Sequence, residues 1–161
     1  MLDIISSIFI PSKIDESESL VRFLLSPLHF KKDKLRTNAY NPTKGTPEVS
    51  MTRLNYSNEN KCKKLAKKIA KNASRKNSLK EFKGFGLITK KVALDCGAND
   101  VIKDPICGNL AHAELILPGT KENEAIASRL QFVQDQLVSK TKVFFDNHPE
   151  SKSWEDPPLH Y

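Results

Sequence analysis

The spacing of apolar residues predicts two helices at the start of the chain. Residues 2–10 carry apolar side chains at helical intervals, and Pro11 ends the segment. The stretch DESESLVRFLLS, residues 15–26, also has the pattern of a helix. Asp15 or Ser17 is a suitable N-cap, acidic residues fill its first turn, and the following Pro27 stops it.

The pattern changes between residues 29 and 55. Glycine and proline become frequent, and the segments KLRTNAY and EVSMTRL alternate apolar with polar residues. Alternation with a period of two is typical of half-buried strands. This region is therefore expected to be rich in loops, with short strands near residues 35–40 and 48–54.

The clearest helical pattern is the stretch SNENKCKKLAKKIAKNAS, residues 57–74, which Ser57 or Asn58 is placed to cap. Its apolar residues form one stripe: Cys62, Leu65, Ala66, Ile69, Ala70 and Ala73. Six lysines cover the other positions, and Arg75 follows: Lys61, Lys63, Lys64, Lys67, Lys68 and Lys71. Because the apolar stripe must take the buried side, the lysines are predicted to be exposed.

Three strands and a short helix are predicted next. Strands are expected in KGFGLI (residues 83–88), in NDVIKDP (99–105) and in AHAELILP (111–118). Thr89 is placed to cap the short helix between the first two, and Gly97 stands where a C-terminal glycine belongs. Gly84 and Gly86 form a G-x-G pattern without the remaining residues of a phosphate loop, which favours close strand packing.

A long helix is predicted within residues 118–142, with Thr120 as its cap. Its buried seam is expected to be Ile126, Leu130, Val133 and Leu137. The remaining residues are polar and rich in proline, which predicts an extended tail anchored by Trp154. The expected fold is α+β, with N-terminal helices, a small mixed sheet, a basic amphipathic helix and a long C-terminal helix. Residues 1–145 would form one domain and 146–161 the tail.

Composition agrees with a single globular domain. The chain has 161 residues, of which 39% are hydrophobic and 28% charged. There is no apolar run of membrane-spanning length and no basic leader, so membrane association is not expected. The three cysteines, Cys62, Cys96 and Cys107, form no C-x-x-C pair. Reduced thiols in a cytoplasmic protein are the simplest interpretation.

The positive charge is concentrated in one part of the chain. The formal net charge is +7, but residues 61–91 carry twelve basic residues and a single acidic one, Glu81. One surface is therefore expected to be electropositive. It would bind a nucleic-acid backbone or an acidic protein partner. No arginine lies among the six lysines, so bidentate base recognition is not indicated. The alternative is a solvated lysine face that binds nothing.

His112-Ala113-Glu114 has the H-x-E form of zinc deaminases. Those enzymes also need a later P-C-x-x-C for two more zinc ligands, and no cysteine follows His112. A site built from Cys96, Cys107 and His112 matches no common zinc spacing. The sequence thus predicts no stoichiometric zinc and no cofactor.

On a strand, His112 and Glu114 point to the same face, because side chains alternate. Two interpretations follow. The pair belongs to the solvated face of a half-covered sheet, or it forms a polar site together with Asp104 and Asn109 from the preceding loop.

Parts of the chain resemble a loosely defined group of small bacterial proteins. The similar stretches are ESLVRFLLSPLHF, EVSMTR and DPICGNLAHAELILPG, about a quarter of the chain. In that group a D-P, a short loop and an N-x-A-H-A segment recur, which Asp104-Pro105, Asn109 and Ala111-His112-Ala113 match. The resemblance implies a bacterial cytoplasmic protein, encoded beside defence or mobile-element genes, and it assigns no reaction.

These observations favour a non-enzymatic accessory or adaptor protein. It would dock to a larger protein or a nucleic-acid complex through the lysine-rich helix. The alternative is a small enzyme with a polar site around Asp104, Asn109, His112 and Glu114. An enzyme should bring these four side chains together, whereas an adaptor should leave them apart or in contact with solvent.

Overall fold

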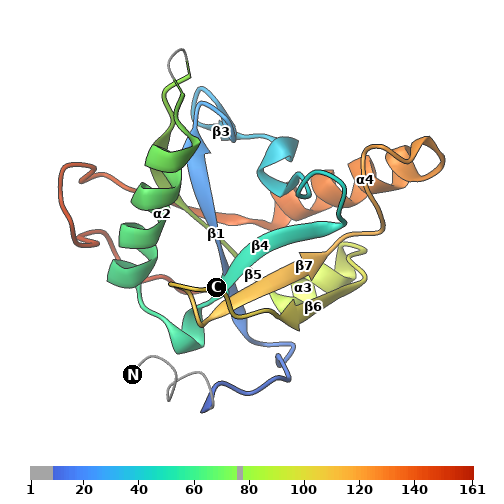
Figure 1. Cartoon of the computed structure of the whole chain (residues 1–161), viewed down its shortest axis with the longest axis horizontal. Coiled ribbons are helices and arrows are strands. Elements are labelled where there is room, and N and C mark those ends of the chain that lie inside the picture. The colour runs from blue at the N-terminus through green and yellow to red at the C-terminus, as the bar shows by residue number, and fades with distance from the viewer. Residues whose placement is uncertain (1–8, 76–77) are drawn as a thin grey trace.

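The computed structural model describes residues 9–75 and 78–161, and it shows an α+β fold built on a six-stranded sheet (Figure 1). The strand order is β6-β7-β4-β1-β5-β8, and every neighbouring pair is antiparallel. The α+β prediction is therefore confirmed, whereas the prediction of a mixed sheet is wrong. The helix expected over residues 2–10 lies almost wholly outside the described residues.

The central strand β1 (Ser19–Ser26) occupies the segment where a second N-terminal helix was predicted, so that prediction is wrong. The strand pairs with β4 (Glu48–Arg53) on one side and with β5 (Glu81–Thr89) on the other. Because the sheet is covered on both faces here, apolar residues point both ways. Leu20 and Leu24 enter one core, and Val21 and Leu25 enter the other. These four apolar positions also have the spacing of one side of a helix, which explains the wrong prediction.

The first face of the sheet packs against two helices, α3 (Lys90–Asp95) and α4 (Glu124–Lys140). Thr89 caps α3 as predicted, since its hydroxyl accepts from the backbone N–H of Val92. The cap of α4 is Asn123 and not Thr120. Three of the four predicted seam residues of α4 are buried in this core: Leu130, Val133 and Leu137.

The second face is covered by α2 (Glu59–Ala73), which lies across β1 and β5. The side chain of Asn58 accepts a hydrogen bond from the backbone N–H of Lys61 and caps the helix. Cys62, Ala66 and Ala70 bring α2 into the second core. In Figure 1, α2 and α4 lie at opposite sides of the molecule, with the sheet between them.

The remaining predicted strands are confirmed at β4, β5, β6 (Asp100–Lys103) and β7 (His112–Ile116). The last strand, β8 (Lys142–Phe145), was not predicted.

The strand expected at residues 35–40 is largely wrong. Only β3 (Lys34–Leu35) forms there, paired with β2 (Phe30–Lys31). A 3-10 turn, η1 (Thr37–Tyr40), follows, and a second one, η2 (Leu54–Tyr56), comes after β4. The turn η1 buries two consecutive residues, Ala39 and Tyr40, instead of alternate ones as a strand would.

The tail, residues 146–161, has no helix or strand and runs beside α2 (red in Figure 1). As the sequence suggested, Trp154 anchors it. The indole ring lies 4.8 Å from the ring of Phe85, and the backbone N–H of Trp154 donates to the side-chain oxygen of Asn60 at 2.8 Å. Leu159 is buried, and its N–H donates to Glu59. The tail is therefore packed onto the second face.

Among the helices that the structure describes, none is long and apolar enough to cross a membrane.

Candidate functional site

The strand β7 places His112 and Glu114 on one face of the sheet. Their cross-strand neighbours on β4 are Thr52 and Ser50. His112 is only 4% exposed and Glu114 only 9%. The interpretation of this face as a solvated surface is thus wrong for both side chains. A histidine and a glutamate are buried together.

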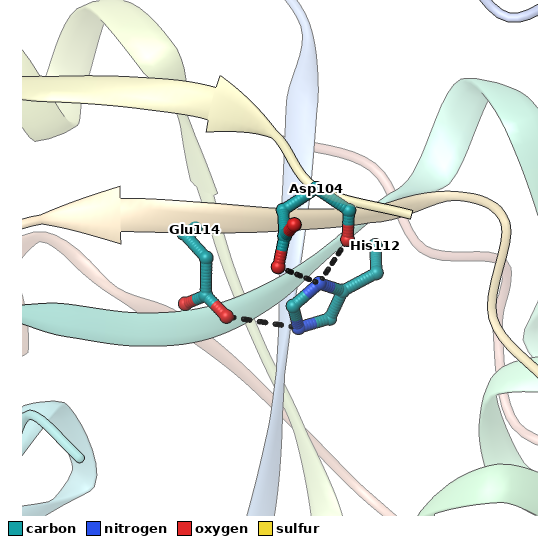
Figure 2. A group of neighbouring side chains, drawn as sticks. All are labelled: Asp104, His112 and Glu114. Atoms are coloured by element: carbon teal, nitrogen blue, oxygen red, sulfur yellow. Dashed lines mark hydrogen bonds and ion pairs between the residues drawn. The ribbon is translucent and has the colours of Figure 1, made fainter. Parts of the chain in front are cut away.

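The imidazole of His112 is held between two acidic residues (Figure 2). Its Nδ1 lies 2.6 Å from the backbone carbonyl oxygen of Asp104 and 3.5 Å from a carboxylate oxygen of the same residue. Because a carbonyl only accepts hydrogen bonds, Nδ1 must carry a proton. The other ring nitrogen, Nε2, lies 3.4 Å from Oε1 of Glu114. In a neutral imidazole, Nε2 therefore turns its lone pair toward this carboxyl group.

The carboxyl group of Glu114 is poorly solvated. Its Oε1 accepts a long hydrogen bond from the hydroxyl of Ser50, at 3.5 Å, and its Oε2 is buried without a partner among the described residues. Burial raises the pKa of Glu114, and the charges of Glu48 and Asp104 raise it further, while His112 lowers it. Glu114 therefore keeps a proton to higher pH than an ordinary glutamate.

Asn109 does not join the cluster. Its side-chain amide donates to the hydroxyl of Thr52 at 2.9 Å, and its backbone oxygen accepts from the N–H of His112. Asn109 thus fixes the start of β7. Of the four polar residues singled out in the sequence, the structure brings together Asp104, His112 and Glu114, and their donor atoms lie within 4.8 Å of one another. The Asp104 side chain is 51% exposed, so the cluster opens to solvent there.

The cysteines do not contribute to this cluster. Cys62 belongs to the second core, Cys96 to the first, and Cys107 is exposed. Among the described residues, the group with metal-ligand spacing is Asp104, His112 and Glu114. The sequence predicted a polar site at these residues, but it did not indicate a metal site, because the zinc patterns compared with it require cysteine ligands.

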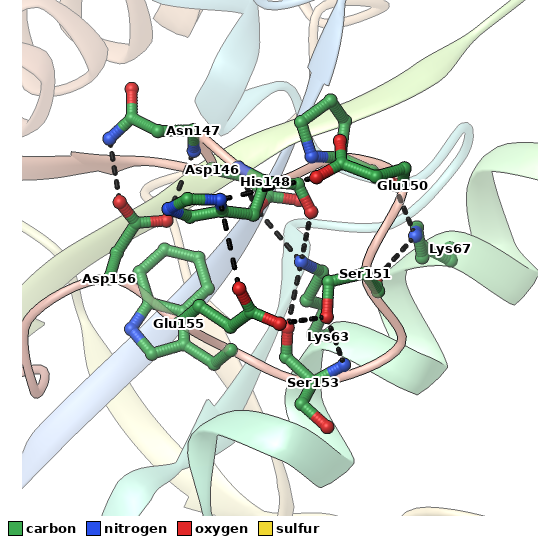
Figure 3. A network of polar contacts seen from close by, with 12 residues as sticks. Lys63, Lys67, Asp146, Asn147, His148, Glu150, Ser151, Ser153, Glu155 and Asp156 are labelled. Atoms are coloured by element: carbon green, nitrogen blue, oxygen red, sulfur yellow. Dashed lines mark hydrogen bonds and ion pairs between the residues drawn. The ribbon is translucent and has the colours of Figure 1, made fainter.

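One of the lysines predicted to be exposed, Lys63, is fully buried, and Figure 3 shows the polar groups around it. The ammonium of Lys63 lies 2.8 Å from a carboxylate oxygen of Asp146, and it donates to the backbone carbonyls of His148 and Ser153. The prediction for Lys63 is therefore wrong. The buried side of α2 is rotated relative to the predicted stripe, so Lys63 enters it while Ile69 is 41% exposed.

Lys67 also faces the tail. Its ammonium donates to the backbone carbonyls of Pro149 and Ser151. Together Lys63 and Lys67 satisfy four backbone carbonyl groups of a segment that forms neither a helix nor a strand. These two lysines have a structural role that the sequence pattern did not reveal.

The other four lysines of α2 form what we call the free lysine face: Lys61, Lys64, Lys68 and Lys71. All four are exposed, and within residues 9–75 and 78–161 none of their ammonium groups has an ion-pair partner. Arg75, just beyond the helix, is exposed as well. The electropositive surface predicted from the sequence thus contains four of the six helix lysines and Arg75.

Comparison with known proteins finds no matching family model, no matching curated protein and no matching solved structure. The resemblance to small bacterial proteins with an N-x-A-H-A segment stays a prediction. The two groups of residues that can carry a function are the buried cluster on β7 and the free lysine face on α2.

Proposed function

We propose that the protein is a non-enzymatic accessory protein that binds a nucleic-acid backbone through the free lysine face of α2. The observation that carries this proposal is the absence of ion-pair partners for Lys61, Lys64, Lys68 and Lys71 within the described residues. Lys63, by contrast, has a carboxylate partner inside the fold.

The four charges repel one another along the helix. Three neighbouring pairs are spaced three or four residues apart: Lys61–Lys64, Lys64–Lys68 and Lys68–Lys71. Each such pair of like charges costs about 0.2–0.5 kcal/mol. A polyanion laid along the helix would neutralise all four charges and release the counterions condensed on its own phosphates. The repulsion between the lysine charges in the free protein would be replaced by attraction to phosphates in the complex.

The length of the face matches a run of phosphates. Lys61 and Lys71 are ten residues apart, which is about 15 Å along a helix axis. A DNA strand advances about 3.4 Å per phosphate along its axis, so the face spans about four phosphates. Lysine ammonium groups act as point charges and do not read base edges in the bidentate manner of arginine. Binding should therefore show little sequence preference.

The structural lysines support this role because they hold α2 in place. Lys63 and Lys67 fasten the tail to one side of the helix, and the apolar side packs on β1 and β5. The free lysine face is thus presented by a helix fixed on two sides. A rigid face loses less entropy on binding than a flexible basic arm.

The test is a charge reversal at the centre of the face. In Lys64→Glu/Lys68→Glu, affinity for a short DNA duplex, measured by fluorescence anisotropy at low salt, should fall at least about tenfold. The free energy of unfolding should stay unchanged or rise slightly, since each new glutamate gains lysine neighbours.

The matched control is Lys44→Glu/Lys121→Glu. It makes the same change in net charge at exposed residues in the loops before β4 and α4. Equal weakening by both double variants would show an unlocalised charge effect and contradict the proposal. The proposal would also be contradicted if the wild-type protein bound an acidic polypeptide but did not bind nucleic acid.

A small enzyme is the second candidate, favoured by the buried contact between His112 and Glu114. In that case Glu114→Gln should abolish the biological activity in the host while nucleic-acid affinity and melting temperature stay at wild-type values. If the lysine face carries the function, the same variant should keep its activity, and Lys64→Glu/Lys68→Glu should lose it.

A further inference from the structure

We propose that Asp104, His112 and Glu114 form a binding site for a divalent transition-metal cation of the Zn²⁺ type. This site is separate from the free lysine face, so either proposal can fail without the other. Three features of the molecule support this site: the orientation of the histidine ring, the spacing of the donor atoms and an unsatisfied carboxylate oxygen.

The orientation of His112 is that of a metal ligand. Metal-binding histidines usually donate their second ring N–H to a backbone carbonyl or a carboxylate, which fixes the tautomer and the ring direction. Nδ1 of His112 has such a partner in the carbonyl oxygen of Asp104, at 2.6 Å. The lone pair of Nε2 is therefore available and points toward Glu114.

The distance between the two donor atoms fits a shared metal ion. Nε2 of His112 and Oε1 of Glu114 are 3.4 Å apart. In a tetrahedral zinc site, with bonds of about 2.0–2.1 Å, two ligand atoms are about 3.4 Å apart. Without a cation or a proton between them, both atoms are hydrogen-bond acceptors, and their approach would be unfavourable.

A second observation points to a missing partner. Oε2 of Glu114 is buried and has no hydrogen-bond partner among the described residues, although Glu114 is only 9% exposed. An unsatisfied buried carboxylate oxygen is costly. A metal ion held by both oxygens of this carboxylate would give Oε2 the partner that it lacks and would compensate much of that cost.

Asp104 would supply the third ligand. Its donor oxygen lies within the same 4.8 Å group, and its side chain is half exposed, so it has room to adjust to an ion. Three protein ligands leave a fourth position for water, as in catalytic zinc sites. One imidazole and two carboxylates suit Zn²⁺ or Mn²⁺, and the carboxylates alone would suit a harder ion.

The experiment is calorimetric titration of Zn²⁺ into the full chain carrying Cys107→Ser, which removes the exposed thiol as a competing ligand. We expect about one ion per chain and at least a hundredfold loss of affinity in Glu114→Gln, which keeps the shape of the side chain. The matched control is His148→Gln. That histidine lies near the carboxylates of Glu150 and Glu155 on the surface, and its loss should change the affinity less than twofold.

A second measurement needs no variant at the site. In nitrogen-15 spectra of the histidine rings, Zn²⁺ should shift the Nε2 resonance of His112 before those of the other histidines. Absence of binding at millimolar Zn²⁺, or equal affinity in the parent protein and Glu114→Gln, would overturn the proposal. Loss of zinc affinity with intact DNA binding would separate this site from the free lysine face.

Discussion

Replacing Lys63 with methionine is expected to lower the free energy of unfolding by about 3–5 kcal/mol, because it leaves a buried charge without its partner. Asp146 would lose its ion pair, and its second carboxylate oxygen already has no partner among the described residues. The carbonyls of His148 and Ser153 would lose a donor as well. Urea denaturation followed by circular dichroism gives the free energy directly.

The matched control is Lys64→Met, one residue along the same helix. Lys64 is exposed and has no ion-pair partner in the described part of the chain, so this change should stay within about 0.5 kcal/mol of wild type. A similar effect of the two substitutions would show that α2 does not bury Lys63. Lys63 would then be exposed, and the free lysine face would have to include it.

A second large effect is expected at acid pH, and it comes from His29. Its Nδ1 accepts a hydrogen bond from the backbone N–H of Leu25 at 3.0 Å, so the native fold requires the neutral ring. Burial lowers the pKa of His29 to about 3, with smaller contributions from the positive charges of Arg22 and Lys80.

The direction of the pH effect follows from this lowered pKa. The pKa of a histidine in an unfolded chain is about 6.5, so His29 contributes its full stability above that pH. The contribution is lost as the pH falls from about 6.5 toward 3. Between pH 8 and pH 4.5, the loss from this residue should be about 2–3 kcal/mol.

Comparison with His29→Asn isolates this contribution, because the asparagine oxygen can accept the same hydrogen bond and does not titrate. Unfolding should be measured for both proteins at pH 8 and pH 4.5. Wild type should lose about 2–3 kcal/mol more than the variant over this interval. An identical loss in both proteins would mean that His29 is already protonated, or solvated, in the fold.

The sequence predicted elements well where one face of a segment is apolar and the other is polar. The strand β4 and the capped helix α3 were found in this way. The strand β1 was missed because it is covered on both faces, and its apolar run carries no alternation. Local spacing does not reveal that a second layer covers the same strand.

The candidate sites, too, could be predicted from the sequence only as far as they depend on local spacing. The two-residue spacing of His112 and Glu114 was enough to place them on one face of a strand. Their burial, and the carbonyl contact that orients the imidazole, depend on the loop that carries Asp104. Lys63 was misassigned because its carboxylate partner, Asp146, lies 83 residues further along the chain. The spacing of residues within one helix gives no indication of a partner so far away in the sequence.

The salt dependence of DNA binding tests the role of the free lysine face most directly. The measured quantity is the slope of the logarithm of the binding constant plotted against the logarithm of the salt concentration. If each of the four lysines, Lys61, Lys64, Lys68 and Lys71, neutralises one phosphate, this slope should be about −3.6. In Lys64→Gln/Lys68→Gln the slope should fall in magnitude to about −1.8. A slope that is the same in wild type and in this variant would contradict the assignment of phosphate binding to this face.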